Sequence, residues 1–320
     1  MKLSLRALLF SCTAVFATQA QAAENLLIGS TSASSSHYGY FVAVGKLINE
    51  KIADTDASVV ETGATLDNLR RIQRGQIDLG LVTTNVAQHA LSGTNAFDGN
   101  PVDTRLLWVY TPAPQNVIVR ADSKIGSLAD LEGKRFNPGI KGSATEKTSE
   151  AVFKTLGITP DYVRGSTTDV VDMIKDNRVD GYVKSGAGQR LDASTLDIAT
   201  FTPISVLSLT AAQQESVRTK MPDISVVDIP AGAADGVPAY TTWSFGVGVT
   251  ASPKLSEETA YNIVKVIMAD KDVQANAMAA LKGADLAQLT LTYGTIPLHP
   301  GAARWFREQG IEIPARLAPK

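Results

Sequence analysis

Arg74-Gly75-Gln76-Ile77-Asp78-Leu79-Gly80 returns in shortened form as Asn177-Arg178-Val179-Asp180-Gly181. Each copy follows a segment whose apolar residues recur at helical spacing, and each opens a short apolar run typical of a buried strand. Strand–helix–strand order with short connections favours a doubly wound, mostly parallel sheet flanked by helices. Two such units predict an α/β protein of two lobes rather than one large sheet.

The segments around the two copies suggest where the chain passes between the lobes. Thr111-Pro112-Ala113-Pro114 is the expected crossover, and the stretch from Pro230 to Pro238 is the expected region of return. We therefore predict a discontinuous lobe 1, residues 23–112 plus 242–320, and a lobe 2 of residues 113–241. Ligands of open α/β sheets bind beyond the carboxyl ends of the strands, so a cleft between the lobes is the expected site.

The first 22 residues are typical of a signal peptide. Lys2 and Arg6 precede an apolar run that is too short to span a bilayer, and Ala20-Gln21-Ala22 is a small-x-small cleavage site. We expect export to the periplasm with residues 1–22 removed. Lipidation of Cys12, the only cysteine, stays open, because the residues before it resemble a lipobox only loosely.

Composition excludes several classes of function. The 320 residues are 44% apolar, and 30 Lys and Arg against 32 Asp and Glu give a formal charge of −2. This balance fits a folded core and argues against nucleic-acid binding. The three histidines lack metal-ligand spacing, and hydrolase, phosphate-loop and complete dinucleotide motifs are missing from the sequence. We therefore expect no metal, no cofactor and no enzymatic activity. We also expect the protein to be a monomer.

Two hydroxyl-rich loops are the candidate binding elements. Ser32-Ala33-Ser34-Ser35-Ser36-His37-Tyr38 runs from a strand into a helix, and Gly139 to Glu146 does the same in the second unit. Backbone N–H groups at such helix starts bind anions, although Ser143 and Glu146 also form the S-x-x-E pattern of plain helix capping. The two loops together predict a cleft for a small anionic ligand.

Several short segments resemble one known family. Ile296-Pro297-Leu298-His299-Pro300-Gly301-Ala302 is close to an "IPLHPGA" signature, and Val119 to Ser123, Leu128 to Arg135 and Gly142 to Glu146 are similar to "VRADS", "LADLKGKR" and "GSGTE". Gly63 to Arg70 and Gly75 to Val82 match further segments in the same order. The mature chain therefore resembles the solute-binding component of a TRAP transporter, of the TAXI class.

The resemblance implies a two-lobed periplasmic binding protein, type II-like, that closes on a small organic acid and delivers it to integral-membrane TRAP symporter subunits. Glutamate-like or dicarboxylate ligands are the family's preference. The sequence departs from the family in the first loop and around Lys184, where an apolar residue is usual. A periplasmic ligand sensor, or a deaminase-like enzyme on the same fold, is the alternative.

The helix starts and the resemblance together define the expected ligand contacts. Lys184 follows a predicted buried strand, so we expect it either to pair with a second ligand carboxylate or to be a solvated lysine at the strand end. The predicted ligand-binding residues are Ser34, Ser35, Ser36, His37, Tyr38 and Thr83 from lobe 1, Gly142, Ser143, Ala144, Thr145, Lys184 and Ser185 from lobe 2, and Asn116 and Trp243 from the crossover and return strands.

Overall fold

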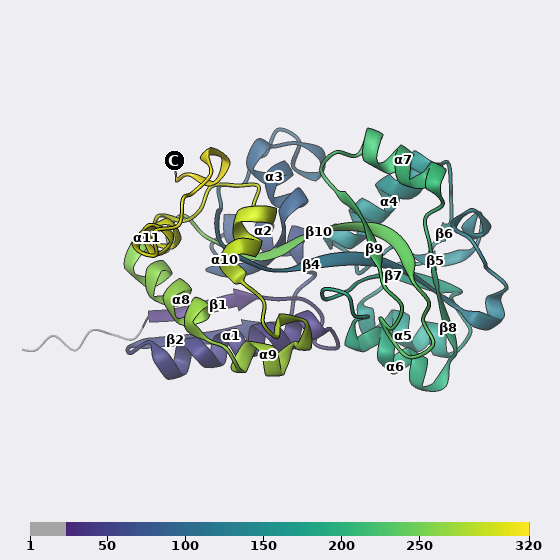
Figure 1. Cartoon of the computed structure of the whole chain (residues 1–320), viewed down its shortest axis with the longest axis horizontal. Helices are drawn as coiled ribbons and strands as arrows, with labels where there is room; N and C mark the ends of the chain where they lie inside the picture. The colour runs from purple at the N-terminus through teal and green to yellow at the C-terminus, as the bar shows by residue number, and fades with distance from the viewer. Residues whose placement is uncertain (1–23, 320) are drawn as a thin grey trace, which may run out of the picture.

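A computed structural model describes residues 24–319 (Figure 1). The predicted signal peptide, its cleavage site and Cys12 lie outside these residues. The strands are β1 (Glu24–Gly29), β2 (Thr55–Val60), β3 (Leu79–Thr83), β4 (Arg105–Arg120), β5 (Arg135–Asn137), β6 (Asp161–Tyr162), β7 (Gly181–Ser185), β8 (Ile204–Leu207), β9 (Ser225–Ile229) and β10 (Tyr240–Ala251).

Helices flank the strands on both sides of the sheet. The α-helices are α1 (Ser36–Lys51), α2 (Thr65–Gln73), α3 (Thr84–Ser92), α4 (Ala144–Leu156), α5 (Thr167–Lys175), α6 (Ala193–Phe201), α7 (Ala211–Lys220), α8 (Glu257–Ala269), α9 (Val273–Ala277), α10 (Leu286–Tyr293) and α11 (Pro300–Glu308). Short 3₁₀ turns are η1 (Asn95–Phe97), η2 (Ala121–Ser123), η3 (Leu128–Leu131), η4 (Ala279–Leu281) and η5 (Ala315–Leu317).

Two long strands join the two parts of the sheet. The strand order is β2-β1-β3-β10-β4-β7-β5-β6, with β8 paired to β4 and β9 paired to β10. The outer pairs β1–β2, β1–β3, β5–β6 and β5–β7 are parallel, as the repeated units predict. The central pairs β3–β10, β10–β4 and β4–β7 are antiparallel, so the sheet is mixed rather than mostly parallel.

Figure 1 shows β4 and β10 running side by side between the two parts of the molecule. We call lobe 1 the part with β1–β3, α1–α3 and α8–α11, and lobe 2 the part with β5–β9 and α4–α7. The predicted α/β fold is confirmed, but the strands form one ten-stranded mixed sheet and not two separate sheets, because β4 and β10 extend through both parts. The predicted lobe boundaries, at 112/113 and 241/242, fall inside β4 and β10. The division of the chain into lobes at these positions stays a prediction.

The crossover prolines lie within β4 instead of in a loop. Pro112 and Pro114 donate no hydrogen bond, but their carbonyl groups accept from the segment after β7. Gly188 N donates to Pro112 O at 3.0 Å, and Gly186 N donates to Pro114 O at 2.8 Å. The prolines therefore leave the strand continuous and tie the end of β7 to the centre of the molecule.

The repeated turn that suggested two units has the same geometry in both lobes. Gly75 (φ +67°) and Asn177 (φ +55°) both adopt the left-handed conformation that ends the preceding helix. Asp78 then accepts a hydrogen bond from Leu27 N, and Asp180 accepts one from Arg135 N, at 2.9 and 3.2 Å. Each aspartate thus ties its turn to the neighbouring parallel strand.

An aromatic cluster fixes the start of α1 against β4. Tyr40 and Tyr110 stack with ring centroids 4.0 Å apart, and Trp108 Nε1 donates to the Tyr40 hydroxyl at 2.8 Å. All three side chains are fully buried. Burying large side chains of this kind contributes about 1.5–3 kcal/mol each, so the first turn of α1 is held firmly in place.

Candidate functional site

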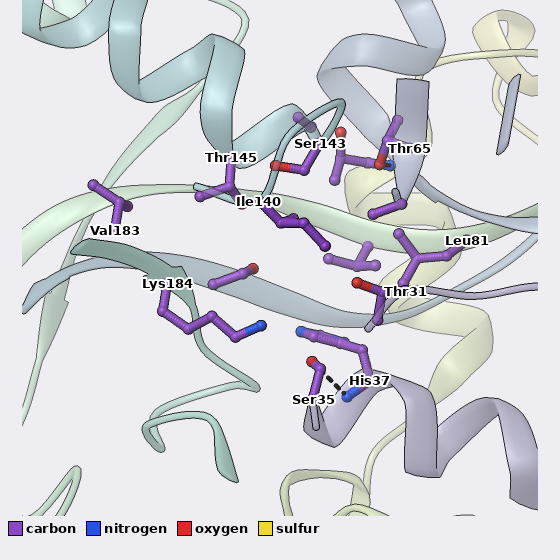
Figure 2. Close-up of a pocket in the computed structure, with 15 residues that line it drawn as sticks. Thr31, Ser35, His37, Thr65, Leu81, Ile140, Ser143, Thr145, Val183 and Lys184 are labelled. Carbon is purple, nitrogen blue, oxygen red and sulfur yellow. Dashed lines mark hydrogen bonds between the residues drawn. The ribbon is translucent and has the colours of Figure 1, made fainter. Parts of the chain in front are cut away.

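A small cavity lies where the two lobes meet (Figure 2). Its volume is about 40 Å³. Lobe 1 supplies Thr31, Ser35, His37, Ala64, Thr65, Leu81 and Thr83, the middle of β10 supplies Val247, and lobe 2 supplies Ile140, Ser143, Ala144, Thr145, Val183, Lys184 and Ser185. Because both lobes line it, the cavity changes size whenever the lobes move relative to each other.

The start of α4 forms one wall of the cavity. Ser143 is the N-cap, and its hydroxyl accepts from Glu146 N at 3.0 Å, as the sequence pattern predicts. The Glu146 carboxylate accepts from Gly142 N rather than from Ser143 N, because Ser143 N already donates to Ile140 O. The first amides of a helix have no acceptor within the helix, which leaves the N–H groups of Ala144 and Thr145 available to a solute.

A glycine allows the loop before α4 to lie close against the first turn of this helix. Gly139 has φ +135°, and a Cβ atom there would lie 2.6 Å from Glu146 N. Any other residue would push the loop away from the first turn of α4. The cavity wall therefore depends on a glycine that does not itself touch the cavity.

Gln115 on β4 orients two of the hydroxyl groups in the cavity wall. Its side-chain oxygen accepts from Thr145 Oγ1 at 2.8 Å, and its side-chain nitrogen donates to Ser185 Oγ at 3.0 Å. Gln115 is fully buried, so these bonds are shielded from water. Thr145 and Ser185 are thereby held in fixed rotamers beside the amides of α4.

Two buried polar groups in the cavity wall have no hydrogen-bond partner among the described residues. They are the Thr83 hydroxyl and the Nε2 atom of His37, on side chains that are 5% and 4% exposed. Buried polar groups are almost always paired, so each is a position where a solute atom could supply the missing partner. Both groups come from lobe 1, opposite α4.

His37 is held as a neutral ring. Its Nδ1 atom lies 2.8 Å from the Tyr110 hydroxyl. Burial lowers the pKa of His37 to about 4 and the ammonium of Lys184 acts in the same direction, although the charge of Asp192 and the nearby backbone of Gly186 oppose the shift. The imidazole therefore carries no charge at neutral pH.

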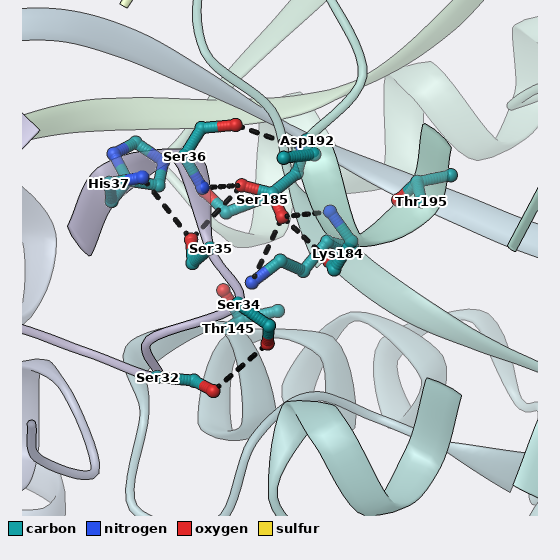
Figure 3. A network of polar contacts seen from close by, with 12 residues as sticks. Ser32, Ser34, Ser35, Ser36, His37, Thr145, Lys184, Ser185, Asp192 and Thr195 are labelled. Carbon is teal, nitrogen blue, oxygen red and sulfur yellow. Dashed lines mark hydrogen bonds and ion pairs between the residues drawn. The ribbon is translucent and has the colours of Figure 1, made fainter. Parts of the chain in front are cut away.

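Asp192 connects the two lobes beside the cavity (Figure 3). It is the N-cap of α6, accepting from Ser194 N at 3.0 Å with one oxygen. Its other oxygen accepts from Ser35 Oγ at 3.0 Å and from Ser36 N at 2.9 Å, at the start of α1. The anion that the first loop was expected to take from solution is therefore a side chain of lobe 2.

Lys184 is not the solvated lysine of one expectation, and its pairing with a second ligand carboxylate stays a prediction. It is buried instead of solvated, and its ammonium lies 3.6 Å from Asp192 Oδ1, with side-chain exposures of 10% and 0%. Figure 2 shows Lys184 and His37 pointing toward each other across the cavity. The lysine thus lines the cavity as predicted, but its charge already has a partner within the protein.

The predicted contact residues divide into two groups. Ser35, His37, Thr83, Ser143, Ala144, Thr145, Lys184 and Ser185 line the cavity. Ser34, Ser36, Tyr38, Gly142, Asn116 and Trp243 do not.

Each residue of the second group has another place in the structure. Ser34 is exposed and Tyr38 lies half-buried on α1, while Ser36 and Gly142 donate their N–H groups to Asp192 and Glu146. Asn116 accepts from the Tyr240 hydroxyl at 2.6 Å, and Trp243 packs edge-on against Phe153.

Sequence reasoning missed Thr31, Thr65, Gln115 and Asp192. Asp192-Ala193-Ser194 reads as an ordinary helix cap, and this signal could have located the start of α6. Its pairing with Ser35 could not be found in this way, because the two residues are 157 positions apart.

The sequence profile of the NMT1-like family matches residues 28–310, and the chain belongs to this family. The fold is also found in solved structures. An ancestral arginine-binding protein bound to arginine is 18% identical, over 80% of this chain and 96% of that chain, with a TM-score of 0.51. A ligand-binding component of an ABC-type import system from Staphylococcus aureus with zinc bound is 13% identical, over 92% and 97%, with a TM-score of 0.50. At these identities the likeness shows the solute-binding-protein fold alone.

Within residues 24–319, no helix is both long and apolar enough to cross a membrane. In the same part of the chain, no group of three or more His, Cys, Asp or Glu side chains could hold a metal ion.

Proposed function

We propose that this protein is an extracytoplasmic solute-binding subunit that closes its lobes on the carboxylate of a small organic acid. The observation that carries the proposal is the composition of the cavity wall. The free amides of Ala144 and Thr145 lie on one side, and the unpartnered groups of Thr83 and His37 lie on the other. The role is capture without catalysis.

A carboxylate fits the chemistry of this wall. Helix α4 has 13 residues, and the positive end of its dipole faces the cavity beside the Thr145 and Ser143 hydroxyls. Carboxylate oxygens accept hydrogen bonds and cannot donate them, which suits amide N–H groups without acceptors. Binding from both lobes would link occupancy of the site to closure of the cleft.

The cavity volume favours small acids. A cavity of roughly 150 Å³ holds benzene, whereas this one measures about 40 Å³. In this conformation the site suits an acid of a few heavy atoms, and a glutamate-sized ligand would require the lobes to separate further. The volume therefore ranks candidate ligands by size.

The proposed membrane partner is a TRAP-type symporter, and this part of the proposal rests on the TAXI resemblance. The most family-like segment, Ile296 to Ala302, is buried in lobe 1, where Ile296 and Leu298 are fully buried and His299 caps α11. The segment thus supports the family as a structural signature rather than as a docking surface. Uptake driven by an ion gradient, and not by ATP, would support the symporter.

A thermal-shift series tests the binding role. The purified protein is heated with the sodium salts of acetate, propionate, butyrate, succinate and glutamate, with sodium chloride as the control. A bound acid at about a hundred times its dissociation constant stabilises the fold by about 2.7 kcal/mol. We expect at least one acid to raise the Tm in a saturable manner. A Tm that none of the five changes beyond the chloride control would overturn the proposal.

A further inference from the structure

Asp192 is a buried acidic side chain that the proposed ligand contacts do not use, although its partner Lys184 lines the cavity. It is fully buried and is not among the residues that line the cavity, whereas its partner Lys184 is; Figure 3 shows the polar groups around the two side chains. Ser35, Ser36 and Ser194 all donate hydrogen bonds to it. A carboxylate with this many donors and a nearby ammonium is ionised at neutral pH.

The charges around the cavity balance each other. The ammonium of Lys184 lies 3.6 Å from Asp192 Oδ1, and His37 is neutral because burial lowers its pKa to about 4. On the α4 side, the buried carboxylate of Glu146 pairs with the guanidinium of Arg164. Before a ligand enters, the cavity wall therefore offers the partial positive charge of one helix start and no unpaired ammonium.

We propose that Asp192 is a specificity-determining residue that restricts the site to acids with a single carboxylate. This inference rests on the proposed function and narrows its ligand class. The ligand carboxylate binds at α4, and the remainder of the ligand must be uncharged where it approaches Lys184. The earlier expectation, that Lys184 answers a second ligand carboxylate, is replaced by its pairing with Asp192.

Electrostatics explains why a second carboxylate is rejected. Lys184 would have to serve two anions, and the ligand's second charge would lie close to Asp192 in a region shielded from water. Like charges in such surroundings repel strongly, because the effective dielectric constant is well below that of water. Removing the charge of Asp192 would reverse the preference, since Lys184 would then lack a partner until a dicarboxylate arrived.

The test compares acids that differ by one carboxylate. Propionate is paired with malonate, and butyrate with succinate, in calorimetric titrations at about pH 7.5. The variant is Asp192→Asn, whose single side-chain oxygen can accept either from Ser36 N or from the cap amide Ser194 N, because the amide nitrogen only donates. Asp197→Asn is the matched control on the same helix, because Asp197 is exposed and pairs with Lys175 away from the cavity.

The wild-type protein and the Asp197→Asn control should bind each monocarboxylate more tightly than its dicarboxylate. In Asp192→Asn, the ratio of the two affinities should shift toward the dicarboxylate by about tenfold or more, as expected when a close charge is removed. An unchanged ratio in a folded Asp192→Asn protein would overturn the inference.

If the variant does not fold, the affinities of the wild-type protein alone test the preference for a single carboxylate. A wild-type protein that prefers malonate to propionate contradicts the inference while leaving the proposed function intact. Failure of all four acids to bind the wild-type protein would overturn the inference, and it would remove the proposed function as well if acetate and glutamate also left the Tm unchanged.

Discussion

The starts of α1 and α4 look alike locally but differ in what they face. Both helices follow a loop rich in small residues, and both are capped by a serine hydroxyl that accepts from a backbone N–H, Ser35 from His37 and Ser143 from Glu146. At α1 the next free amide, Ser36 N, donates to Asp192 of the other lobe. At α4 the first amides have no acceptor within the helix, and Ala144 and Thr145 line the cavity.

The difference shows that a hydroxyl-rich helix start in a sequence does not tell whether its anionic partner is a side chain of the protein or a bound solute. One start is satisfied by a carboxylate of the protein and holds the lobes together, and the other is available to a solute. Stability should therefore depend on α1 and its partner Asp192, while affinity should depend on α4 and the groups opposite it. Three substitutions or conditions separate these two roles.

The largest effect is expected from Asp192→Ala. The change leaves Lys184 buried without a partner and removes the acceptor of Ser35 and Ser36, so it should lower the free energy of unfolding by about 3–5 kcal/mol. Urea denaturation followed by circular dichroism measures this loss. Asp197→Ala, which removes an exposed ion pair, should cost at most about 1 kcal/mol. Equal, small losses in both variants would show that α1 does not rely on Asp192.

Acid should weaken the α1 side of the cleft through His37. Burial lowers the pKa of His37 in the folded protein to about 4, whereas the unfolded chain takes up the proton near 6.5. Between these values the unfolded state binds more protons, so stability is lost as the pH falls, by about 3 kcal/mol in total. Burial alone would raise the pKa of Asp192, but Lys184 and the hydrogen bonds to the carboxylate lower it. Protonation of Asp192 therefore reduces the stability of the fold only at pH values below this window.

Replacing the ring tests the assignment of this loss. In His37→Gln, denaturation curves collected from about pH 7 to pH 4 should lose most of the pH dependence. A smaller part should remain, because burial also lowers the pKa of His299. A variant with the full wild-type pH dependence would place the titrating group elsewhere.

Local signals in the sequence predicted much of the fold. The turn at Arg74–Gly80, the cap at Ser143 and the strand from Val179 to Val183 depend on neighbouring residues and appear close to where they were expected. The antiparallel pairing of β4 with β10 was missed, because it joins residues that lie more than a hundred positions apart. Alternating strands and helices in a sequence favour parallel pairing. Only the tertiary structure reveals that the long strands β4 and β10 run antiparallel through the centre of the sheet.

The site was predictable to the same extent. Residues at helix starts, such as Thr145, and at strand ends, such as Lys184 and Thr83, were expected at the cavity from the helix starts and the family resemblance together, and they line it. Ser36 and Trp243, which were also predicted to contact the ligand, are not among the residues that line the cavity. Ser36 has a partner from the other lobe, and Trp243 turns toward Phe153 on α4, and neither contact has a local signature.

The smallest effect on stability, with a clear effect on affinity, is expected from Thr83→Val. The Thr83 hydroxyl is buried without a partner, so its removal should leave the free energy of unfolding unchanged or raise it by up to about 1 kcal/mol. Binding of propionate should weaken several-fold in calorimetry.

Thr65→Val is the matched control, since the Thr65 hydroxyl accepts from Thr83 N at 3.2 Å and also lines the cavity. This control should lose about 1 kcal/mol of stability. A Thr83→Val protein that is less stable and binds as tightly as the wild type would make Thr83 structural.

The most direct test follows backbone amides by nuclear magnetic resonance while propionate is added to isotope-labelled protein. If the solute binds at α4, the amide signals of Ala144 and Thr145 should move furthest and saturate, because they acquire an acceptor. The Ser36 amide, already bonded to Asp192 at 2.9 Å, should move least among the three. A saturable shift of Ser36 with Ala144 and Thr145 unchanged would contradict the account, since the ligand would then bind at the start of α1.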